Sequence, residues 1–212
     1  MYAYDCAASS RSGTYARGVE LLESQADPDP LRQFASWRGE AGDELGAVAL
    51  ATATPNGAPS VRMVLLKGAD ERGLTFFSNY ESRKGAELAA NPRAALLVYW
   101  PAAGRQVRVE GGVTRLAPAE SDAYFATRPA WSRVSAAASP QSSVVSDRAE
   151  LERRVDDVRG RHGDDPPRPE SWGGYRLAPA TWEFWQHRED RLHDRLRYRR
   201  DGTSWLVERL AP

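Results

Sequence analysis

The amino-acid sequence predicts a mainly β fold of the α+β class, an antiparallel β-barrel with accessory helices. Short strand-like segments follow one another at close intervals through most of the chain. Asn56-Gly57 and Asp201-Gly202 are hairpin-turn signals between two pairs of these segments. Segments with helical spacing interrupt the strands, and the sequence has no internal repeat. A chain of 212 residues can bury one substantial core, which favours a single folded domain.

The N-terminal region, residues 1–28, is predicted to be a flexible arm. It is polar and aperiodic, and it contains the structure-breaking stretches Ser9–Gly13 and Asp27–Pro30. Helical spacing then follows from residue 31 and ends near residue 39. We therefore place the folded domain at residues 29–212.

The remaining elements follow from local patterns of apolar residues, caps and turns. Strands are expected at residues 47–54, 60–67, 74–79, 94–100 and 106–116, and two closing strands at about 191–199 and 204–210. Helices are expected at residues 82–90, where Ser82 is the N-cap, at 118–127, which opens on Pro118, and at 147–159, where Leu151 and Val155 form a buried stripe.

Composition excludes several classes of protein. Lys plus Arg and Asp plus Glu both number 29, so no net charge attracts the chain to nucleic acid or to an anionic membrane. One cysteine excludes an internal disulfide framework, and three scattered histidines argue against a metal site. The sequence shows no secretory-signal pattern and no apolar run near the ~20 residues of a membrane span. We expect a soluble, cytoplasmic protein without a metal.

Three positive or titratable side chains alternate near the C-terminus, at Arg191, His193 and Arg195. On a β-strand they would share one face. Such a face suits a planar anionic ligand, because Arg offers a bidentate fork and His a switchable proton. The alternative is a solvated strand face.

Two further groups of cations favour anion binding. Arg83 and Lys84 stand in the first turn of a predicted helix, where positive charge is unfavourable unless an anion binds there. Arg62 and Lys67 lie on one predicted strand at odd spacing, so they should face opposite sides and serve two different anions. The alternatives are an exposed basic turn for the first pair and solvated strand ends for the second.

A third group predicts a site for a phosphate monoester. Tyr124 and Arg128 lie four residues apart on a predicted helix and share a face, and Ser132 follows. An ordinary surface Tyr–Arg pair is the alternative. Side chains that could contact a heterocycle are Gln106, Gln141, Ser142 and Trp185.

Taken together, these motifs resemble the pyridoxine (pyridoxamine) 5′-phosphate oxidase family over about residues 29–212. The matching blocks are Arg62–Lys67, Ser82–Lys84, Asn91–Arg93, Arg105–Val107, Tyr124-Phe125, Arg128-Pro129, Ser139–Ser143, Trp172–Gly174, Glu183–Gln186, Arg191–Arg195 and Arg209–Pro212. No single block is specific, but their number and order are.

The resemblance implies an FMN-binding split barrel that forms a homodimer, with its flavin sites at the subunit interface. The implied activity is oxidation of pyridoxamine 5′-phosphate, pyridoxine 5′-phosphate or both to pyridoxal 5′-phosphate. Hydride would pass from the substrate to the flavin, and O2 would reoxidise the flavin and yield H2O2, with ammonia released from the amine substrate.

The resemblance also implies roles for individual residues. The FMN set is Arg62, Met63, Val64, Leu65, Leu66, Lys67, Phe77, Ser78, Arg83, Lys84, Gln106, Gln141, Ser142, Trp185 and Arg195. The substrate set is Lys67, Tyr124, Arg128 and Ser132 around the phosphate, with Arg191 and His193 over the pyridine ring as catalytic residues.

Two departures from the family pattern bear on the active site. The family's Arg-x-x-Tyr lid has no direct match, because Arg11 and Tyr15 are separated by three residues and Arg17 lies beyond them. The stretch Ser135–Ala138 replaces Gly and Trp of many members.

Two alternative functions remain open at the sequence level. A related flavin oxidase of the phenazine-biosynthesis type would act on another substrate, and it would not need Lys67 or the phosphate-binding hydroxyls. A non-catalytic carrier of flavin or pyridoxal phosphate would not need Arg191 and His193 together.

Overall fold

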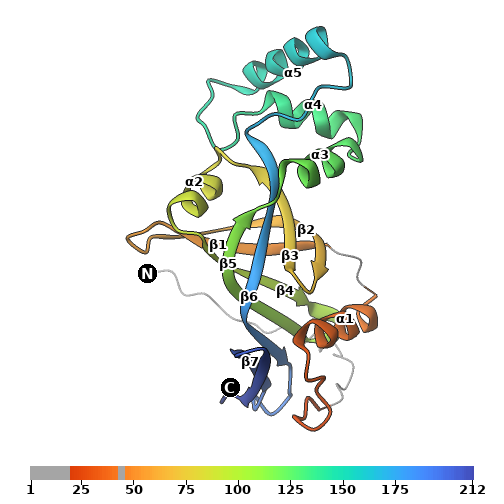
Figure 1. Ribbon diagram of the computed structural model, residues 1–212, viewed down its shortest axis with the longest axis vertical. Coiled ribbons are helices and arrows are strands. Elements are labelled where there is room, and N and C mark those ends of the chain that lie inside the picture. Colours follow the sequence, from red (N-terminus) through yellow and green to blue (C-terminus); the bar gives the residue numbers. More distant parts are fainter. Residues whose placement is uncertain (1–19, 43–45) are drawn as a thin grey trace, which may run out of the picture.

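One antiparallel sheet of eight strands dominates the computed structural model, which describes residues 20–42 and 46–212 (Figure 1). The strands are β1 (Ala47–Ala53), β2 (Pro59–Asp70), β3 (Gly73–Asn79), β4 (Arg93–Trp100), β5 (Arg105–Arg115), β6 (Trp172–Gln186), β7 (Asp194–Asp201) and β8 (Ser204–Arg209). Their order is β3-β2-β1-β4-β5-β6-β7-β8, and β3 also pairs with β6. This second pairing closes the first six strands into a barrel, which confirms the predicted fold class.

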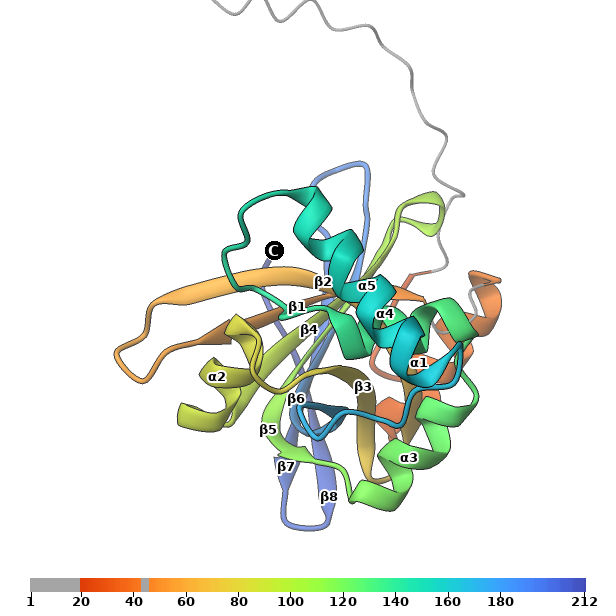
Figure 2. The same cartoon turned by 90° about the horizontal axis from the view of Figure 1, so that it is seen from above.

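Helices lie at both ends of the barrel (Figures 1 and 2). They are α1 (Pro30–Glu40), α2 (Arg83–Ala90), α3 (Pro118–Ala126), α4 (Ala130–Ala138) and α5 (Arg148–His162), with a 3-10 turn at Pro101–Ala103. Helices α3, α4 and α5 gather at one end, and α4 packs on α5 through Val134, Ala138 and Val158. None of the helices in the described ranges is long and apolar enough to cross a membrane.

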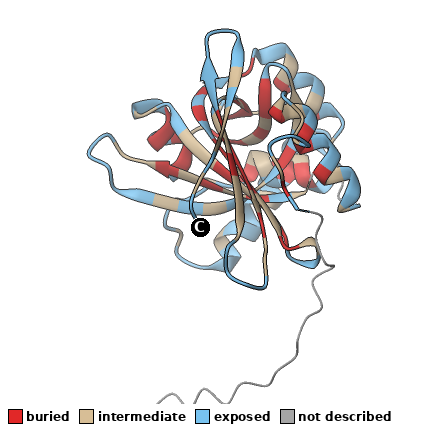
Figure 3. Cartoon of the chain, turned by 90° about the horizontal axis from the view of Figure 1, so that it is seen from below, coloured by how far each residue is buried: buried red, intermediate tan, exposed pale blue. Residues whose placement is uncertain are grey.

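The core fills the barrel, and Figure 3 shows the buried residues following the middle of the strands. Inward-facing residues alternate with outward-facing ones, as on β1, where Val48 and Leu50 are buried. Helix α1 adds Phe34 and Trp37 to this core. The Phe34 ring is tilted against Trp182 of β6, and the Trp37 ring meets Phe184 of β6 edge to face. Strand β6 packs on α1 and pairs with three strands, β3, β5 and β7. It carries candidate site residues at both of its ends.

Most predicted elements are present with shifts of one to three residues at their ends, including the Ser82 cap of α2 and the Asp201-Gly202 turn. Two elements were not predicted as such: the 15-residue strand β6 and helix α4.

The closing strand begins later than predicted, at Asp194. Arg191 has a left-handed backbone (φ 63°) in a turn, where its N–H donates to the Arg188 carbonyl oxygen at 3.3 Å. The Leu192 N–H donates to Asp190 Oδ1 at 3.0 Å, so local turn chemistry prevails over the alternating pattern. The prediction that Arg191, His193 and Arg195 share one strand face is therefore wrong.

Residues 20–28 belong to the predicted N-terminal arm and lie in the described part of the chain. Residues 20–28 pack on the domain: Leu21 is buried, its N–H donates to Asp194 Oδ2 at 3.3 Å, and the Tyr198 hydroxyl donates to the Asp27 carbonyl oxygen at 2.9 Å. Residues 1–19 lie outside the described part of the chain, and with them the lid candidates Arg11, Tyr15 and Arg17.

Candidate active site

The first group of site residues surrounds the N-terminus of α2, and we call it the α2 cluster: Ser78, Arg83, Lys84 and Gln141. Lys84 is buried, and its Nζ donates to Gln141 Oε1 at 2.7 Å and to Ser82 Oγ at 3.2 Å. Ser78 Oγ donates to the same Gln141 oxygen at 3.3 Å. These bonds bring together residues that are far apart in the sequence, as the resemblance implied.

Burial and the positive charge of Arg62 lower the pKa of Lys84 to about 8, although Glu87 acts in the opposite direction. A buried ammonium is stabilised by a neighbouring anion, because the low-dielectric surroundings disfavour an uncompensated charge. Together with the backbone N–H groups of the first helical turn, Lys84 makes this end of α2 suitable for a phosphate group.

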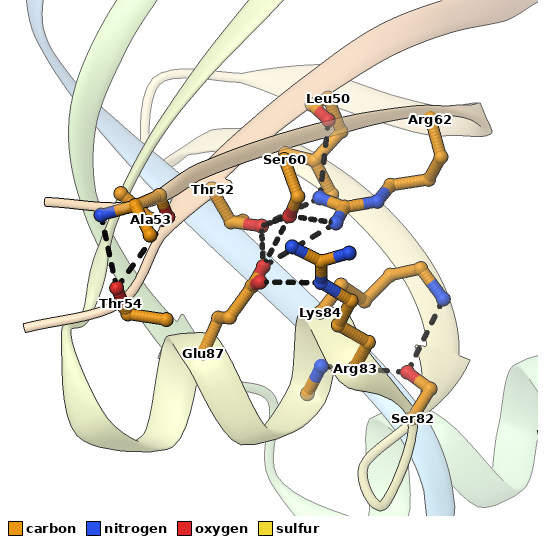
Figure 4. A network of polar contacts seen from close by, with 12 residues as sticks. Leu50, Thr52, Ala53, Thr54, Ser60, Arg62, Ser82, Arg83, Lys84 and Glu87 are labelled. Atoms are coloured by element: carbon orange, nitrogen blue, oxygen red, sulfur yellow. Dashed lines mark hydrogen bonds and ion pairs between the residues drawn. The ribbon is translucent and has the colours of Figure 1, made fainter. Parts of the chain in front are cut away.

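Glu87, on the same helix, joins two of the predicted cofactor residues (Figure 4). Its carboxylate accepts a hydrogen bond from Arg83 Nε at 2.9 Å and lies 3.3 Å from Arg62 Nη2. Burial alone would raise the pKa of Glu87, but hydrogen bonds from Ser60, Thr52, Arg83 and Arg62 outweigh it and lower the pKa to about 2. Glu87 is therefore an anion throughout the physiological range.

The six β2 residues of the predicted FMN set divide between the two faces of the strand. Val64 and Leu66 face the barrel interior, whereas Met63 and Leu65 are 62% and 53% exposed on the outside. Lys67 is also exposed, at a bulge between Leu66 and Gly68. Arg62 and Lys67 thus lie on opposite faces, as their spacing predicted. The side chains of Val64 and Leu66 belong to the core, so only the backbone of these two residues is left for a ligand.

A second group, the aromatic cluster, consists of Phe77, Tyr124 and Trp172. The ring centroids of Phe77 and Tyr124 are 3.9 Å apart, and those of Phe77 and Trp172 are 5.5 Å apart, with nearly parallel planes. Glycine at position 174 leaves room for this packing, since a Cβ there would lie 2.4 Å from Leu116 Cδ1 and 2.8 Å from Phe77 Cε1. This explains structurally why the Trp172-Gly-Gly174 motif lies opposite Phe77 and Ser78 in the β3–β6 pairing.

Arg128 packs against the aromatic cluster, with its guanidinium carbon 4.6 Å from the centroid of the Trp172 ring. Its Nη1 is buried and has no hydrogen-bond partner among the described residues. Burial lowers the pKa of Arg128, and the neighbouring Tyr124 offsets part of this effect. Ser132, across the junction from α3 to α4, is buried as well. A buried donor without a partner is costly, and an anionic ligand would satisfy it.

The third group, the Trp185 cluster, contains Gln106, Trp185, His193 and Arg195. Gln106 pairs with Trp185 between β5 and β6, and Trp185 pairs with Arg195 between β6 and β7, so the three side chains lie in a row across the sheet. The His193 ring lies 4.7 Å from that of Trp185. His193 Nδ1 accepts a hydrogen bond from the Arg188 N–H at 3.0 Å, so the neutral ring carries its proton on Nε2.

Arg195 is held by the buried carboxylate of Glu183, with an Nη2–Oε1 distance of 2.8 Å, and its Nη1 donates to the Ala211 carbonyl oxygen at 2.7 Å. Arg108 Nη2 binds the other oxygen of Glu183 at 2.6 Å. Arg191 is exposed in its turn, and Ser142 is exposed with a φ of 74°. Arg195 is therefore rigidly placed, whereas Arg191 is not.

The site residues fall at two distant ends of β6. Trp172, at one end, joins the aromatic cluster, and the α2 cluster adjoins it through Ser78, which pairs with Gly173. Trp185, 13 residues later, joins the third cluster, which corresponds to roughly 40 Å along an extended strand. Figure 1 shows β6 running the length of the barrel between these ends. One chain cannot bring both sets onto one small ligand.

Sequence reasoning missed two residues that organise the site, Glu87 and Glu183. Each is a buried carboxylate that binds two arginines. The spacing of Arg83 and Glu87, four residues apart on a predicted helix, is a signal that could have identified the first. In the described ranges no group of His, Cys, Asp and Glu could hold a metal ion.

Comparison with known families and proteins gives consistent matches. Residues 40–162 match the family model described as pyridoxamine 5′-phosphate oxidase, and residues 172–212 match the pyridoxine 5′-phosphate oxidase C-terminal dimerisation region. The chain is 56% identical to a pyridoxine/pyridoxamine 5′-phosphate oxidase of Cupriavidus taiwanensis, covering 94% of this chain and 96% of the relative. It is 57% identical to that of Ralstonia pickettii, covering 93% and 95%.

Among solved structures, PhzG from Burkholderia lata in complex with tetrahydrophenazine-1-carboxylic acid has a TM-score of 0.85 at 34% identity, covering 92% of this chain and all of that chain. An FMN-binding protein from Nostoc punctiforme, related to pyridoxamine 5′-phosphate oxidase, has a TM-score of 0.66 at 21% identity, covering 89% and 99%. The second likeness concerns the fold alone.

Proposed function

The chain belongs to the pyridoxamine 5′-phosphate oxidase family, and from this we propose that it oxidises pyridoxamine 5′-phosphate and pyridoxine 5′-phosphate to pyridoxal 5′-phosphate. The observation that carries the proposal is an identity of 56% over nearly the whole chain to a relative of that name. The oxidation needs a flavin, for which we propose FMN, and O2 as the final acceptor. Water completes the amine reaction, and the other products are H2O2 and, from the amine, ammonia.

The residues of the α2 cluster fit the FMN phosphate. Lys84 is a buried cation with only neutral oxygen partners, and Arg83 uses Nε on Glu87, so its two Nη groups remain for another acceptor. Gln141 and Ser78 add polar groups beside the same helix end. When bound, the flavin supplies the hydride acceptor that no side chain of this protein could replace.

The substrate phosphate is assigned to Arg128, with Tyr124, Ser132 and Lys67. The unpartnered Nη1 of Arg128 supports this assignment, because a phosphate oxygen would satisfy it. In a phenazine-type oxidase the same residues would face a carboxylated tricyclic ring without phosphate. The buried Ser132 and the buried, unpartnered Nη1 of Arg128 favour the phosphorylated substrate.

Arg191 and His193 are proposed to act on the pyridine ring of the substrate. His193 is oriented by the bond from the Arg188 N–H to Nδ1, which leaves Nε2 as the atom that can donate a proton to the substrate or hold one. Arg195 is fixed by Glu183 and presents a positive edge beside Trp185. In this proposal Arg191, His193 and Arg195 orient the substrate and stabilise the charge that develops beside the substrate carbon from which hydride is lost.

The match to a dimerisation region supports a homodimer. Since the two ends of β6 are too far apart to share one ligand, we assign each active site to two subunits. One subunit supplies the α2 and aromatic clusters, and the other supplies the Trp185 cluster. The exposed apolar side chains Val61, Met63 and Leu65 on the outer face of β2 suit burial against a second copy.

The experiment that tests the proposal measures peroxide from purified protein with each of three substrates: pyridoxamine 5′-phosphate, pyridoxine 5′-phosphate and unphosphorylated pyridoxamine. We expect turnover with the phosphorylated compounds, far weaker turnover with pyridoxamine, and release of FMN on denaturation. A colourless protein that does not take up FMN would refute the flavoenzyme assignment. Bound FMN without peroxide from either phosphate would favour a carrier or another substrate.

A further inference from the structure

Glu87 stands between Arg62 and Arg83, two arginines of the proposed FMN set, yet a carboxylate cannot itself be a phosphate ligand. It is 5% exposed and is surrounded by groups from three elements: Thr52 on β1, Ser60 and Arg62 on β2, and Arg83 on α2 (Figure 4). A carboxylate beside a phosphate site repels the ligand directly. Its presence in this network therefore requires a different explanation.

The two carboxylate oxygens of Glu87 are used differently. Oε2 accepts hydrogen bonds from Thr52 Oγ1 and Ser60 Oγ, both at 2.5 Å, and from Arg62 Nη2 at 3.3 Å, which anchors it to the barrel. Oε1 accepts from Arg83 Nε at 2.9 Å. In the described part of the chain the Nη groups of Arg83 have no other hydrogen-bond partner, so Glu87 holds the guanidinium from behind and leaves its outer edge for a ligand.

Both Nη groups of Arg62 are engaged in this network. Its Nη1 donates to the Leu50 carbonyl oxygen at 3.2 Å and to Thr52 Oγ1, and its Nη2 donates to Ser60 and Glu87. Its main contribution in this arrangement is to fix Glu87 against β1 and β2. On α2 itself, the cations that can still donate to a phosphate are Arg83, through its Nη groups, and Lys84.

We propose that Glu87 is a positioning residue for the cofactor phosphate, which aligns Arg83 through its Nε. This inference rests on the proposed FMN-dependent function. The same carboxylate also acts on the neighbouring cation: the charges that face Lys84 are Arg62 from β2 and Glu87 from α2, and its direct partners Ser82 and Gln141 are neutral. The phosphate of FMN is attracted only to the protonated form of Lys84.

The sign of the pH effect follows from the pKa of Lys84, about 8 in the cofactor-free protein. Below that pH Lys84 is a cation and FMN binding is strongest. As the pH rises above 8, a proton must be taken up on binding, so the affinity for FMN falls by up to about tenfold per pH unit. Glu87 raises the pKa of Lys84, so its neutralisation moves the start of this fall to lower pH.

The test is a titration of the full chain, freed of flavin, with FMN and with riboflavin between pH 6.5 and 9.5, followed by quenching of flavin fluorescence. For Glu87→Gln we expect FMN affinity roughly tenfold or more weaker at pH 8, with the fall beginning at lower pH than in the wild type. Riboflavin, which has no phosphate, should bind both proteins alike. The matched control is Glu152→Gln, which removes the same (i, i+4) Arg Nε–Glu Oε1 contact from Arg148 on α5, at 2.8 Å.

A double variant makes the test independent of folding. If Glu87 acts largely by aligning Arg83, then Glu87→Gln should cost much less FMN affinity in an Arg83→Gln background than alone. Additive losses, an unshifted pH profile, or equal losses for FMN and riboflavin would each overturn the inference. If the wild-type chain binds no FMN at any pH, the proposed function fails instead, and the two failures are distinguishable.

Discussion

Mixed dimers provide a direct test of the assignment of each active site to two subunits. We consider one subunit with Arg128→Met, which damages the aromatic end of β6, and one with His193→Asn, which damages the Trp185 end. Asn retains an acceptor near the position of Nδ1 for the Arg188 N–H but removes Nε2. Each variant alone should form inactive or weakly active homodimers.

The expected magnitude follows from the length of β6. Trp172 and Trp185 are 13 residues apart, roughly 40 Å along the strand, so Arg128 and His193 of one chain cannot contact the same substrate. In a mixed dimer, one site combines both damaged halves and the other combines both intact halves. The mixed dimer should therefore have about half of the wild-type turnover.

The assay uses differently tagged subunits that are co-expressed and purified through both tags, followed by measurement of peroxide production. The control is a mixed dimer of wild type with the double variant Arg128→Met, His193→Asn. If sites are shared, each site in this control carries one defect and the dimer is inactive. If each site belonged to one chain, the control would keep half of the activity and the first mixed dimer would have none, which would refute the argument from β6.

Three further predictions concern single residues. Arg128→Met should lower kcat/KM for pyridoxamine 5′-phosphate by ~100-fold and leave kcat/KM for pyridoxamine unaffected. The control is Arg200→Met, which removes another arginine that lies over a tryptophan, 4.2 Å from the centroid of the Trp205 ring. Equal losses with both substrates would contradict the phosphate assignment. Glu183→Gln should lower the free energy of unfolding by about 1–3 kcal/mol at fixed protein concentration, since it weakens the bonds to Arg108 and Arg195. An unchanged denaturation midpoint would show that those bonds do not contribute to stability. Gly174→Ala should destabilise by about 1–3 kcal/mol and alter the near-ultraviolet circular dichroism, because the new Cβ would lie 2.4 Å from Leu116 Cδ1 and 2.8 Å from Phe77 Cε1. A spectrum and melting temperature like those of the wild type would contradict this.

Local sequence signals were sufficient to predict most of the fold. Ser82 caps α2 with its Oγ on the Gly85 N–H at 3.3 Å, and the Asp201-Gly202 turn joins β7 to β8 as expected. Barrel closure is different, because it depends on the pairing of β3 with β6, which are about a hundred residues apart. No local pattern encodes such a pairing.

The unpredicted elements have separate causes. Strand β6 contains Gly173, Gly174 and Pro179, which normally argue against a long strand, but the glycines make room for Tyr80 and Phe77, and Pro179 lies at an irregularity in the β5–β6 pairing. Helix α4 ends in three alanines, the best helix formers, and this signal was available in the sequence.

The site residues were found as motifs, but their grouping was beyond the sequence. The spacing of Arg62 and Lys67 correctly placed them on opposite faces of β2. The spacing of residues could not predict the ion pair between Arg62 and Glu87, because that contact depends on how α2 lies against β1 and β2. The division of the site between two ends of β6 likewise required the register of the sheet.

Arg191 and His193 lie outside strand β7, and this changes the roles that we expect for Arg191, His193 and Arg195 in substrate binding. On one strand face with Arg195, the three groups would have been equally rigid. In the structure Arg195 is fixed by Glu183, and His193 is fixed through Nδ1 and packed beside Trp185. Arg191 is exposed on a turn whose left-handed residue already departs from regular backbone. The active site proposed between two subunits must admit substrate from solvent, and a residue on a turn can move without disturbing the sheet. We therefore expect Arg191 to move toward the substrate when it binds, whereas His193 and Arg195 keep the positions that they have in the structure.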